Sequence, residues 1–253
     1  MDGGRRTWTA LWSHNDEDRR RPLLDALEQG AGWIEPDVWV VGEDVLVGHD
    51  RPDPSMSLRE VYLEPLRQRH DDLDHFYLVL DVKSAPDISM PVIERTLAAY
   101  DDVLTHATRG TVVRRPVTVL LSGTLSNRVA LQADSVGMTY DGRLGNVPDG
   151  ASPEWMPLVS ASWRDHFWWR GVGPMLPRDQ RRLRELVTEV HEAGLRLRFW
   201  SLPEWAPWWR RRLWTTLLDA GVDVITTDRP EKLGRLLRAR EAHQEVSRGR
   251  PSS

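Results

Sequence analysis

The amino-acid sequence predicts an α/β fold, a (β/α)8 TIM barrel, from three observations. Apolar runs typical of buried strands alternate with helical segments, and there are eight such runs. The alternation predicts a parallel sheet with right-handed crossovers, and the count favours a closed barrel. Polar residues follow the ends of many runs, and the length of 253 residues suits one barrel. We therefore expect one domain over residues 1–242 and a disordered polar tail over residues 243–253.

The expected strands are short runs dominated by aliphatic, β-branched and aromatic residues. The third is apolar almost throughout, as expected of a strand that is covered on both faces. After the second strand, Asp44–Val47 looks like a short return that presents His49. The eight strands are Thr7–Trp12, Trp33–Val41, Phe76–Val82, Val117–Leu121, Val136–Tyr140, Leu158–Ser162, Leu195–Ser201 and Val222–Thr226.

Helices are expected between the strands, where apolar residues recur at helical spacing. Arg21-Pro22 opens the first helix and Gly30 closes it. Ser57 caps a second amphipathic segment that reaches Leu66. The later helical segments are Pro91–His106, Asn127–Ala133, Pro177–Ala193, Trp208–Ala220 and Pro230–Ala242.

Composition narrows the class of protein. Hydrophobic residues make up 40% of the chain and charged residues 28%, which is ordinary for a globular domain with a substantial core. A net charge of −4 gives no reason to expect nucleic acid as a partner. The absence of cysteine excludes disulfides and thiolate metal sites. Because no apolar stretch suits a secretory signal or a membrane span, we expect a cytoplasmic protein without stable membrane insertion. The oligomeric state stays open.

Two histidines and two acids stand close together in residues 13–51. Glu35 and Asp37 are two positions apart in an apolar run, so on a strand both carboxylates would leave the same face. Oxygen ligands at this spacing suit Mg²⁺, with Ca²⁺ as the alternative. His14 and His49 lie at the ends of apolar runs on either side of the acids, where imidazoles can exchange protons near neutral pH.

This stretch resembles the phospholipase C-like phosphodiesterase superfamily, which includes the glycerophosphodiester phosphodiesterases. The resemblance is closest to a branch named after altered inheritance of mitochondria in yeast, in which His-Asn-Asp, an acid-x-acid strand and Gly-His-Asp recur in this order. It implies that His14 and His49 are the acid/base pair and that Glu35 and Asp37 are metal ligands. The strand and helix pattern agrees over nearly the whole chain, but the specific motifs lie between residues 13 and 84.

The third strand ends in Asp81-Val82-Lys83, which is similar to the superfamily's acid-x-Lys motif. The resemblance implies that Asp81 is the third metal ligand and Lys83 a phosphate contact; a salt bridge between the two is the alternative. Two features depart from the glycerophosphodiesterase pattern. Asn15-Asp16 stands where that group has Arg-Gly, and Asp81 stands where it has glutamate. These departures bear more on the glycerol substrate than on the fold or the phosphodiester chemistry.

Other residues also fall at the C-terminal ends of expected strands, where barrel enzymes build their sites. We expect Asn15, Arg143 and Trp200 to contact substrate, although Arg143 also suits a turn built on Asp141-Gly142. Tryptophans cluster after the sixth and seventh strands. Three interpretations are open: an aromatic wall for the substrate, a packed lid over the barrel, and a lipid-docking surface.

The expected function is metal-dependent cleavage of a small-molecule or lipid-headgroup phosphodiester. Because negative charge grows on the phosphate in the transition state, a divalent ion and Lys83 would stabilise it. One histidine would activate the nucleophile and the other would protonate the leaving oxygen, and the sequence leaves open which does which. Two alternatives remain: a lyase of the same fold that forms a cyclic phosphate, and a non-catalytic barrel that binds a phosphorylated ligand.

Overall fold

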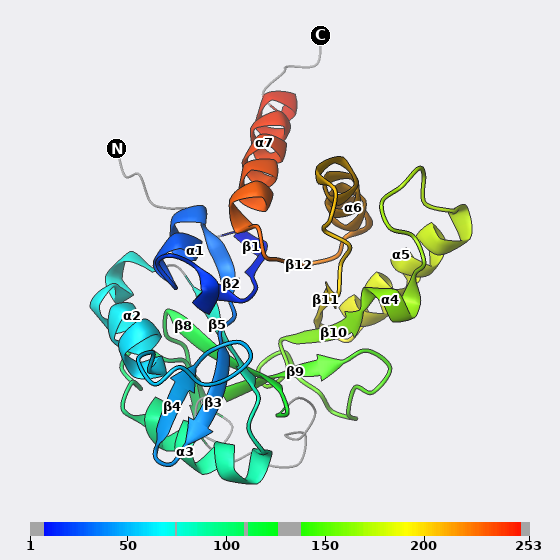
Figure 1. Ribbon diagram of the computed structural model, residues 1–253. Helices are drawn as coiled ribbons and strands as arrows, with labels where there is room; N and C mark the ends of the chain where they lie inside the picture. Colours follow the sequence, from blue (N-terminus) through cyan, green and yellow to red (C-terminus); the bar gives the residue numbers. More distant parts are fainter. Residues whose placement is uncertain (1–7, 74, 109–110, 126–137, 249–253) are drawn as a thin grey trace.

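The fold is a closed (β/α)8 barrel, as the sequence predicts. The computed structural model describes residues 8–73, 75–108, 111–125 and 138–248, and in it parallel strands pair in a ring (Figure 1). The first and last strands close the ring, with Leu11 opposite Ile225. The strands of the ring are β1 (Trp8–Ser13), β2 (Ala31–Ile34), β5 (Phe76–Val82), β8 (Val117–Gly123), β9 (Met138–Arg143), β10 (Leu158–Ser162), β11 (Arg196–Trp200) and β12 (Val224–Thr227).

The second strand is interrupted, and the expectation of one continuous run over Trp33–Val41 is wrong. β2 stops before Pro36, which has no backbone N–H for the strand ladder, and β3 (Asp37–Val41) begins after it. Both pieces pair with β5, but β3 then turns back into β4 (Asp44–Val47) as an antiparallel hairpin. Glu35 and Asp37 therefore do not lie on one continuous strand, and the expectation that strand alternation places both carboxylates on the same face does not apply.

Helices cover the outside of the barrel. α3 (Pro86–Ala98) packs on β3 and β4, α5 (Pro177–Glu192) packs on β11, and α7 (Pro230–Arg248) packs on β1 (Figure 1). The other helices are α1 (Leu24–Gln29), α2 (Glu64–Gln68), α4 (Trp163–His166) and α6 (Pro207–Ala220), with short helical turns at Asp16–Asp18, Arg59–Leu63 and His70–Asp72. Within the described ranges, no helix combines the length and the apolar character that a membrane span requires.

Several predicted boundaries need correction. α3 occupies Pro86–Ala98 rather than Pro91–His106, because Pro86 takes the first-turn position, where a missing N–H breaks no helical hydrogen bond. A small hairpin, β6 (His106–Thr108) and β7 (Thr111–Val113), follows it. α7 continues beyond Ala242, so residues 243–248 of the expected tail are helical. The expected helix Asn127–Ala133 and residues 249–253 lie outside the described residues.

Stacked aromatic rings fill the inside of the barrel. The ring centroids of Trp12 and Trp33 are 5.4 Å apart, and those of Trp33 and Tyr77 are 3.8 Å apart. Leu11, next to Trp12, packs instead into the layer between the strands and the helices, because neighbouring strand residues face opposite ways. The indole N–H of Trp12 donates a hydrogen bond to Glu35, so the aromatic column reaches the polar residues at the strand ends.

Candidate active site

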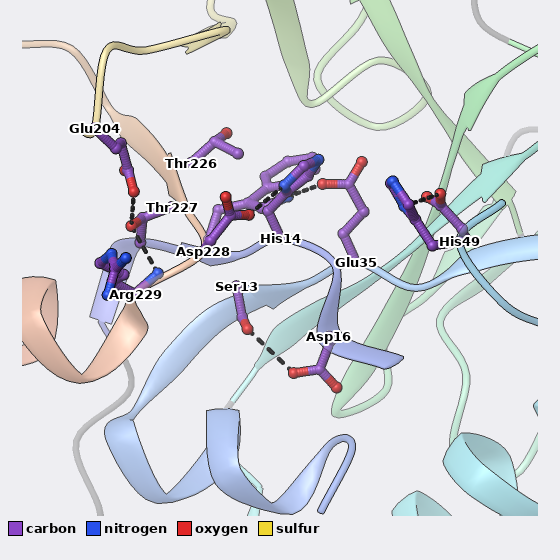
Figure 2. Close-up of polar contacts among 12 residues, drawn as sticks. Ser13, His14, Asp16, Glu35, His49, Glu204, Thr226, Thr227, Asp228 and Arg229 are labelled. Carbon is purple, nitrogen blue, oxygen red and sulfur yellow. Dashed lines mark hydrogen bonds and ion pairs between the residues drawn. The ribbon is translucent and has the colours of Figure 1, made fainter. Parts of the chain in front are cut away.

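Polar side chains from several strands converge at the C-terminal mouth of the barrel. His14 follows β1, Glu35 follows β2, and Asp228 follows β12. Figure 2 shows the Glu35 carboxylate between the rings of His14 and His49 in this view, with Asp228 beside His14. His14 and Asp228 are 214 positions apart in the sequence, so the site depends on closure of the barrel.

His14 is held on one side of this mouth by Asp228. Its Nδ1 lies 2.7 Å from Oδ1 of Asp228, and its backbone N–H donates to the carbonyl of Thr227. Burial lowers the pKa of His14, but the hydrogen bond to Asp228 and the negative charges of Glu35 and Asp228 outweigh burial and raise the pKa above its ordinary value. The same hydrogen bond lowers the pKa of Asp228. This arrangement favours a carboxylate-bound imidazolium.

His49 is held on the other side by Asp37. Its Nδ1 lies 3.0 Å from Oδ2 of Asp37, and the carbonyl of Asp37 accepts the N–H of Gly48, which begins the loop that carries His49. Burial raises the pKa of Asp37, and Asp81 raises it further, whereas Lys83 and His49 oppose the rise. The carboxylate that holds His49 is thus buried among other charges.

Lys83 bridges two of the predicted metal ligands. Its Nζ lies 2.9 Å from Oδ2 of Asp37 and 2.8 Å from Oδ2 of Asp81. The two acids face each other in register on β3 and β5. Burial lowers the pKa of Lys83, but the two carboxylates outweigh burial and raise it. Lys83 therefore forms the salt bridge that the sequence left as the alternative, and a phosphate contact stays a prediction.

Glu35 points into the barrel and is paired with Arg198, a residue that sequence reasoning missed. Nη2 of Arg198 lies 3.4 Å from Oε2 of Glu35, and its guanidinium sits 3.6 Å from the centroid of the Trp12 ring. Burial raises the pKa of Glu35, and Arg198 and His14 oppose the rise. A buried arginine within an apolar strand was the signal in the sequence, because such a charge requires a partner.

Arg143 reaches the mouth beside a buried polar cluster. Its Nη1 donates to Oδ2 of Asp141 at 2.7 Å. The fully buried Asp141 also accepts hydrogen bonds from the hydroxyls of Ser122 and Ser160. Asp141-Gly142 is part of β9 and not of a turn, so the turn interpretation is wrong. Substrate contact by Arg143 stays a prediction.

Asn15 and Trp200 lie at strand ends, as predicted. Asn15 has left-handed backbone angles, φ 47° and ψ 51°, and its buried Oδ1 has no hydrogen-bond partner. Trp200, at the end of β11, is partly exposed. The tryptophan clusters are mixed: Trp163 is buried against Phe167 and Phe199, whereas others are exposed, Trp168 by 88%. The buried Trp163 fits a packed lid, and the roles of the exposed tryptophans stay predictions.

Two further acids at the site were missed by sequence reasoning. Glu17 is buried in the turn after His14, and burial raises its pKa to about 8. Glu204 lies in the loop before α6, where its Oε2 accepts a hydrogen bond from Thr227 at 3.0 Å (Figure 2) and burial raises its pKa to about 7. The sequence feature that pointed to Glu17 was its position directly after Asn15-Asp16. No sequence feature pointed to Glu204.

The donor atoms at this mouth suit a hard divalent cation. Carboxylate oxygens are the ligands that Mg²⁺ and Ca²⁺ prefer, and Oδ1 of Asp81 is buried without a hydrogen-bond partner. Among the described residues, the three potential ligands whose atoms lie within 4.8 Å of one another are Glu17, Asp37 and His49. The predicted set of Glu35, Asp37 and Asp81 shares one residue with this group. Whether that set holds the metal stays a prediction.

Known proteins match both the motifs and the fold. The model of the AIM6-like phosphodiesterase domain matches residues 7–74, the segment that contains His14 and His49. Altered inheritance of mitochondria protein 6 of Eremothecium gossypii is 31% identical over 273 residues, with 87% of this chain and 67% of that protein covered.

Two solved structures share the fold. One is a glycerophosphoryl diester phosphodiesterase from Parabacteroides distasonis, with a TM-score of 0.56, 13% identity and coverage of 94% of this chain and 88% of that chain. The other is the phosphatidylinositol-specific phospholipase C of Listeria monocytogenes, with a TM-score of 0.50, 12% identity and coverage of 92% and 93%. The resemblance inferred from the histidine motifs is confirmed, and the chain belongs to the family of altered inheritance of mitochondria protein 6, whose phosphodiesterase-like domain has the phospholipase C-like barrel fold.

Proposed function

We propose that this protein is a metal-dependent phosphodiesterase that cleaves a small-molecule or lipid-headgroup phosphodiester with two histidines. The observation that carries the proposal is the paired arrangement of His14 and His49, each with Nδ1 on a carboxylate oxygen. Because a carboxylate only accepts hydrogen bonds, Nδ1 donates in both pairs, and Nε2 of each ring is left for proton transfer.

Each histidine would move one proton at the substrate. One ring takes a proton at Nε2 from the nucleophile, either water or a substrate hydroxyl, and the other gives a proton from Nε2 to the leaving oxygen. Asp228 and Asp37 keep the two rings oriented and stabilise whichever ring carries the positive charge. After one turnover the two protonation states are exchanged, and proton exchange with water restores them. Because both rings are held by a carboxylate at Nδ1, either histidine can serve as the acid or as the base.

Glu35, Asp37 and Asp81 are the proposed ligands of the cation, Mg²⁺ or Ca²⁺. When bound, the cation supplies positive charge to the non-bridging phosphate oxygens as the transition state forms. Lys83 bridges Asp37 and Asp81 and holds them close to each other. We propose that Lys83, Arg143, Asn15 and Trp200 contact the substrate. A cytoplasmic location stays a prediction.

Substitution of the histidines tests the proposal. His14→Ala and His49→Ala should each lower the turnover of a phosphodiester panel by about 10² to 10⁴-fold, because each removes one proton transfer. The thermal midpoint should stay within a few degrees, since both side chains lie at the open mouth. His70→Ala, in a surface turn, is the matched control and should keep full activity. Full activity in both mouth variants would refute the acid/base assignment.

The same panel separates the alternatives. Analysis of the phosphorus product by ³¹P NMR distinguishes a monoester from a cyclic phosphate, and a cyclic product would show that a substrate hydroxyl is the nucleophile. Binding of a phosphodiester without any turnover would favour the non-catalytic barrel.

A further inference from the structure

Glu17 is a buried acid for which the proposed reaction has no role. It lies in the helical turn Asp16–Asp18, and only 6% of the residue is exposed. Its neighbour Asp16 anchors the turn, because the Asp16 carboxylate accepts hydrogen bonds from the hydroxyls of Ser13 and Tyr62. The turn is therefore fixed by one acid, while the other acid stays available.

Both carboxylate oxygens of Glu17 are buried, and no side chain among the described residues donates a hydrogen bond to either. A buried carboxylate without a lysine or arginine partner is unfavourable, so such a group is expected to bind a cation or to hold a proton. Burial raises the pKa of Glu17 to about 8, which expresses the same cost. The carboxylate thus lacks a lysine or arginine partner of the kind that Lys83 provides for Asp37 and Asp81 and Arg198 provides for Glu35.

The surroundings of Glu17 contain the other atoms that a cation requires. Its Oε1 lies 3.9 Å from Nδ1 of His49, and ligand atoms of Glu17, Asp37 and His49 all lie within 4.8 Å of one another. Glu35 is hydrogen-bonded to Trp12 and paired with Arg198, and Lys83 contacts both Asp37 and Asp81. Glu17 is the acid of this group that no lysine or arginine contacts among the described residues.

We propose that Glu17 is a direct ligand of the divalent cation, together with Asp37. This inference rests on the proposed metal dependence and adds a ligand to it. Two carboxylates at this spacing suit Mg²⁺ or Ca²⁺, which complete their shells with water and substrate oxygens. His49 keeps its hydrogen bond to Oδ2 of Asp37, so its ring would stay next to the residues that hold the cation.

Calorimetric titration of the EDTA-treated full chain with MgCl₂ and with CaCl₂ tests the assignment. Glu17→Gln should weaken binding at least tenfold relative to wild type. Asp18→Asn is the matched control, because it removes the same charge from an exposed position in the same turn, and it should change the affinity less than twofold. Glu17→Asp, which keeps the carboxylate, should fall between wild type and Glu17→Gln.

The remaining outcomes separate this inference from the proposed function. If Glu35→Gln and Asp37→Asn lose the cation while Glu17→Gln binds it as wild type does, the role of Glu17 is refuted and metal dependence stands. If wild type binds neither cation, both are refuted. If, in that case, phosphodiester turnover persists in EDTA, catalysis by the two histidines is retained without a metal.

Thermal melting supplies a readout that does not depend on turnover or on heat of binding. Without metal, Glu17→Gln should melt at or above the wild-type midpoint, because a neutral amide replaces an unpaired buried acid. With Mg²⁺ added, the midpoint of wild type should rise and that of Glu17→Gln should not. An equal rise in both proteins would refute the assignment, since it would place the cation on other residues.

Discussion

The two sides of the barrel mouth hold a histidine in the same way but in different surroundings. On one side, His14 is bound to Asp228, whose side chain is 63% exposed. On the other side, His49 is bound to Asp37, whose side chain is 2% exposed and also contacts Lys83. Water screens the first pair, whereas the second belongs to a buried group of charges. Removing one charge should therefore disturb the His49 side more than the His14 side.

Asp37→Asn should give the largest effect. The amide removes a proposed metal ligand, weakens the orientation of His49 and leaves Lys83 with one carboxylate fewer. We expect loss of Mg²⁺ binding in calorimetry and a fall in turnover of about 10³-fold or more, combining the metal and proton-transfer contributions. Asp44→Asn, on the exposed end of the β3–β4 hairpin, is the control. Unchanged cation affinity in Asp37→Asn would contradict its role on this side.

Asp228→Asn should give an intermediate effect, because the amide oxygen still accepts the hydrogen bond of His14 while the charge is lost. We expect turnover to fall about 10 to 100-fold, as for other residues that orient a functional imidazole. With Asp228 neutral, the pKa of His14 should fall, because the negative charge of Asp228 no longer offsets burial. NMR titration of the His14 ring measures this change. A loss of activity as large as that of Asp37→Asn would show that burial does not distinguish the two sides.

Glu204→Gln should give the smallest effect, on stability rather than on chemistry. The pKa of Glu204 is raised to about 7 in the folded protein, from an ordinary value of 4.5. Between these pH values the folded state holds a proton that the unfolded state has lost, so wild-type stability falls as the pH rises. Glu204→Gln lacks this fall, so the difference in thermal midpoint between Glu204→Gln and wild type should increase in favour of the variant by about 10 °C between pH 4.5 and 8.

The control for this pH dependence is an exposed acid. Glu154→Gln removes the same charge from an exposed residue, and its midpoint relative to wild type should not depend on pH in this range. If the difference in thermal midpoint between Glu204→Gln and wild type did not change with pH, Glu204 would be ionised over the whole range. The His14 side of the mouth would then carry the negative charge of Glu204 as well.

The strands were predictable because each buried run is local in the sequence. The break in the second strand was missed although Pro36 is visible in the sequence, since the apolar pattern continues across it. The β3–β4 hairpin follows from the same break. Helix ends were less predictable, because Pro86 and Pro91 are equally plausible first-turn residues by sequence.

The site was predictable only where its residues form motifs. His14, Glu35 and Asp37 could be proposed because they stand in recognisable short patterns. Arg198 could not be paired from sequence, because its partner Glu35 is 163 positions away and meets it only across the barrel. Glu17 was passed over for another reason: an acid next to Asp16 looks like part of a solvated turn, and only the three-dimensional structure shows that it is buried without a lysine or arginine partner.

The pairing of β1 with β12 has a consequence for the order of events during synthesis. Because β1 finds its partner only when residues near position 225 have emerged, a growing chain exposes an open sheet edge for most of its translation. His14 likewise gains Asp228 only at that moment. The pair that holds His14 is thus completed by the last strand, and a nascent or prematurely terminated chain cannot carry this half of the site.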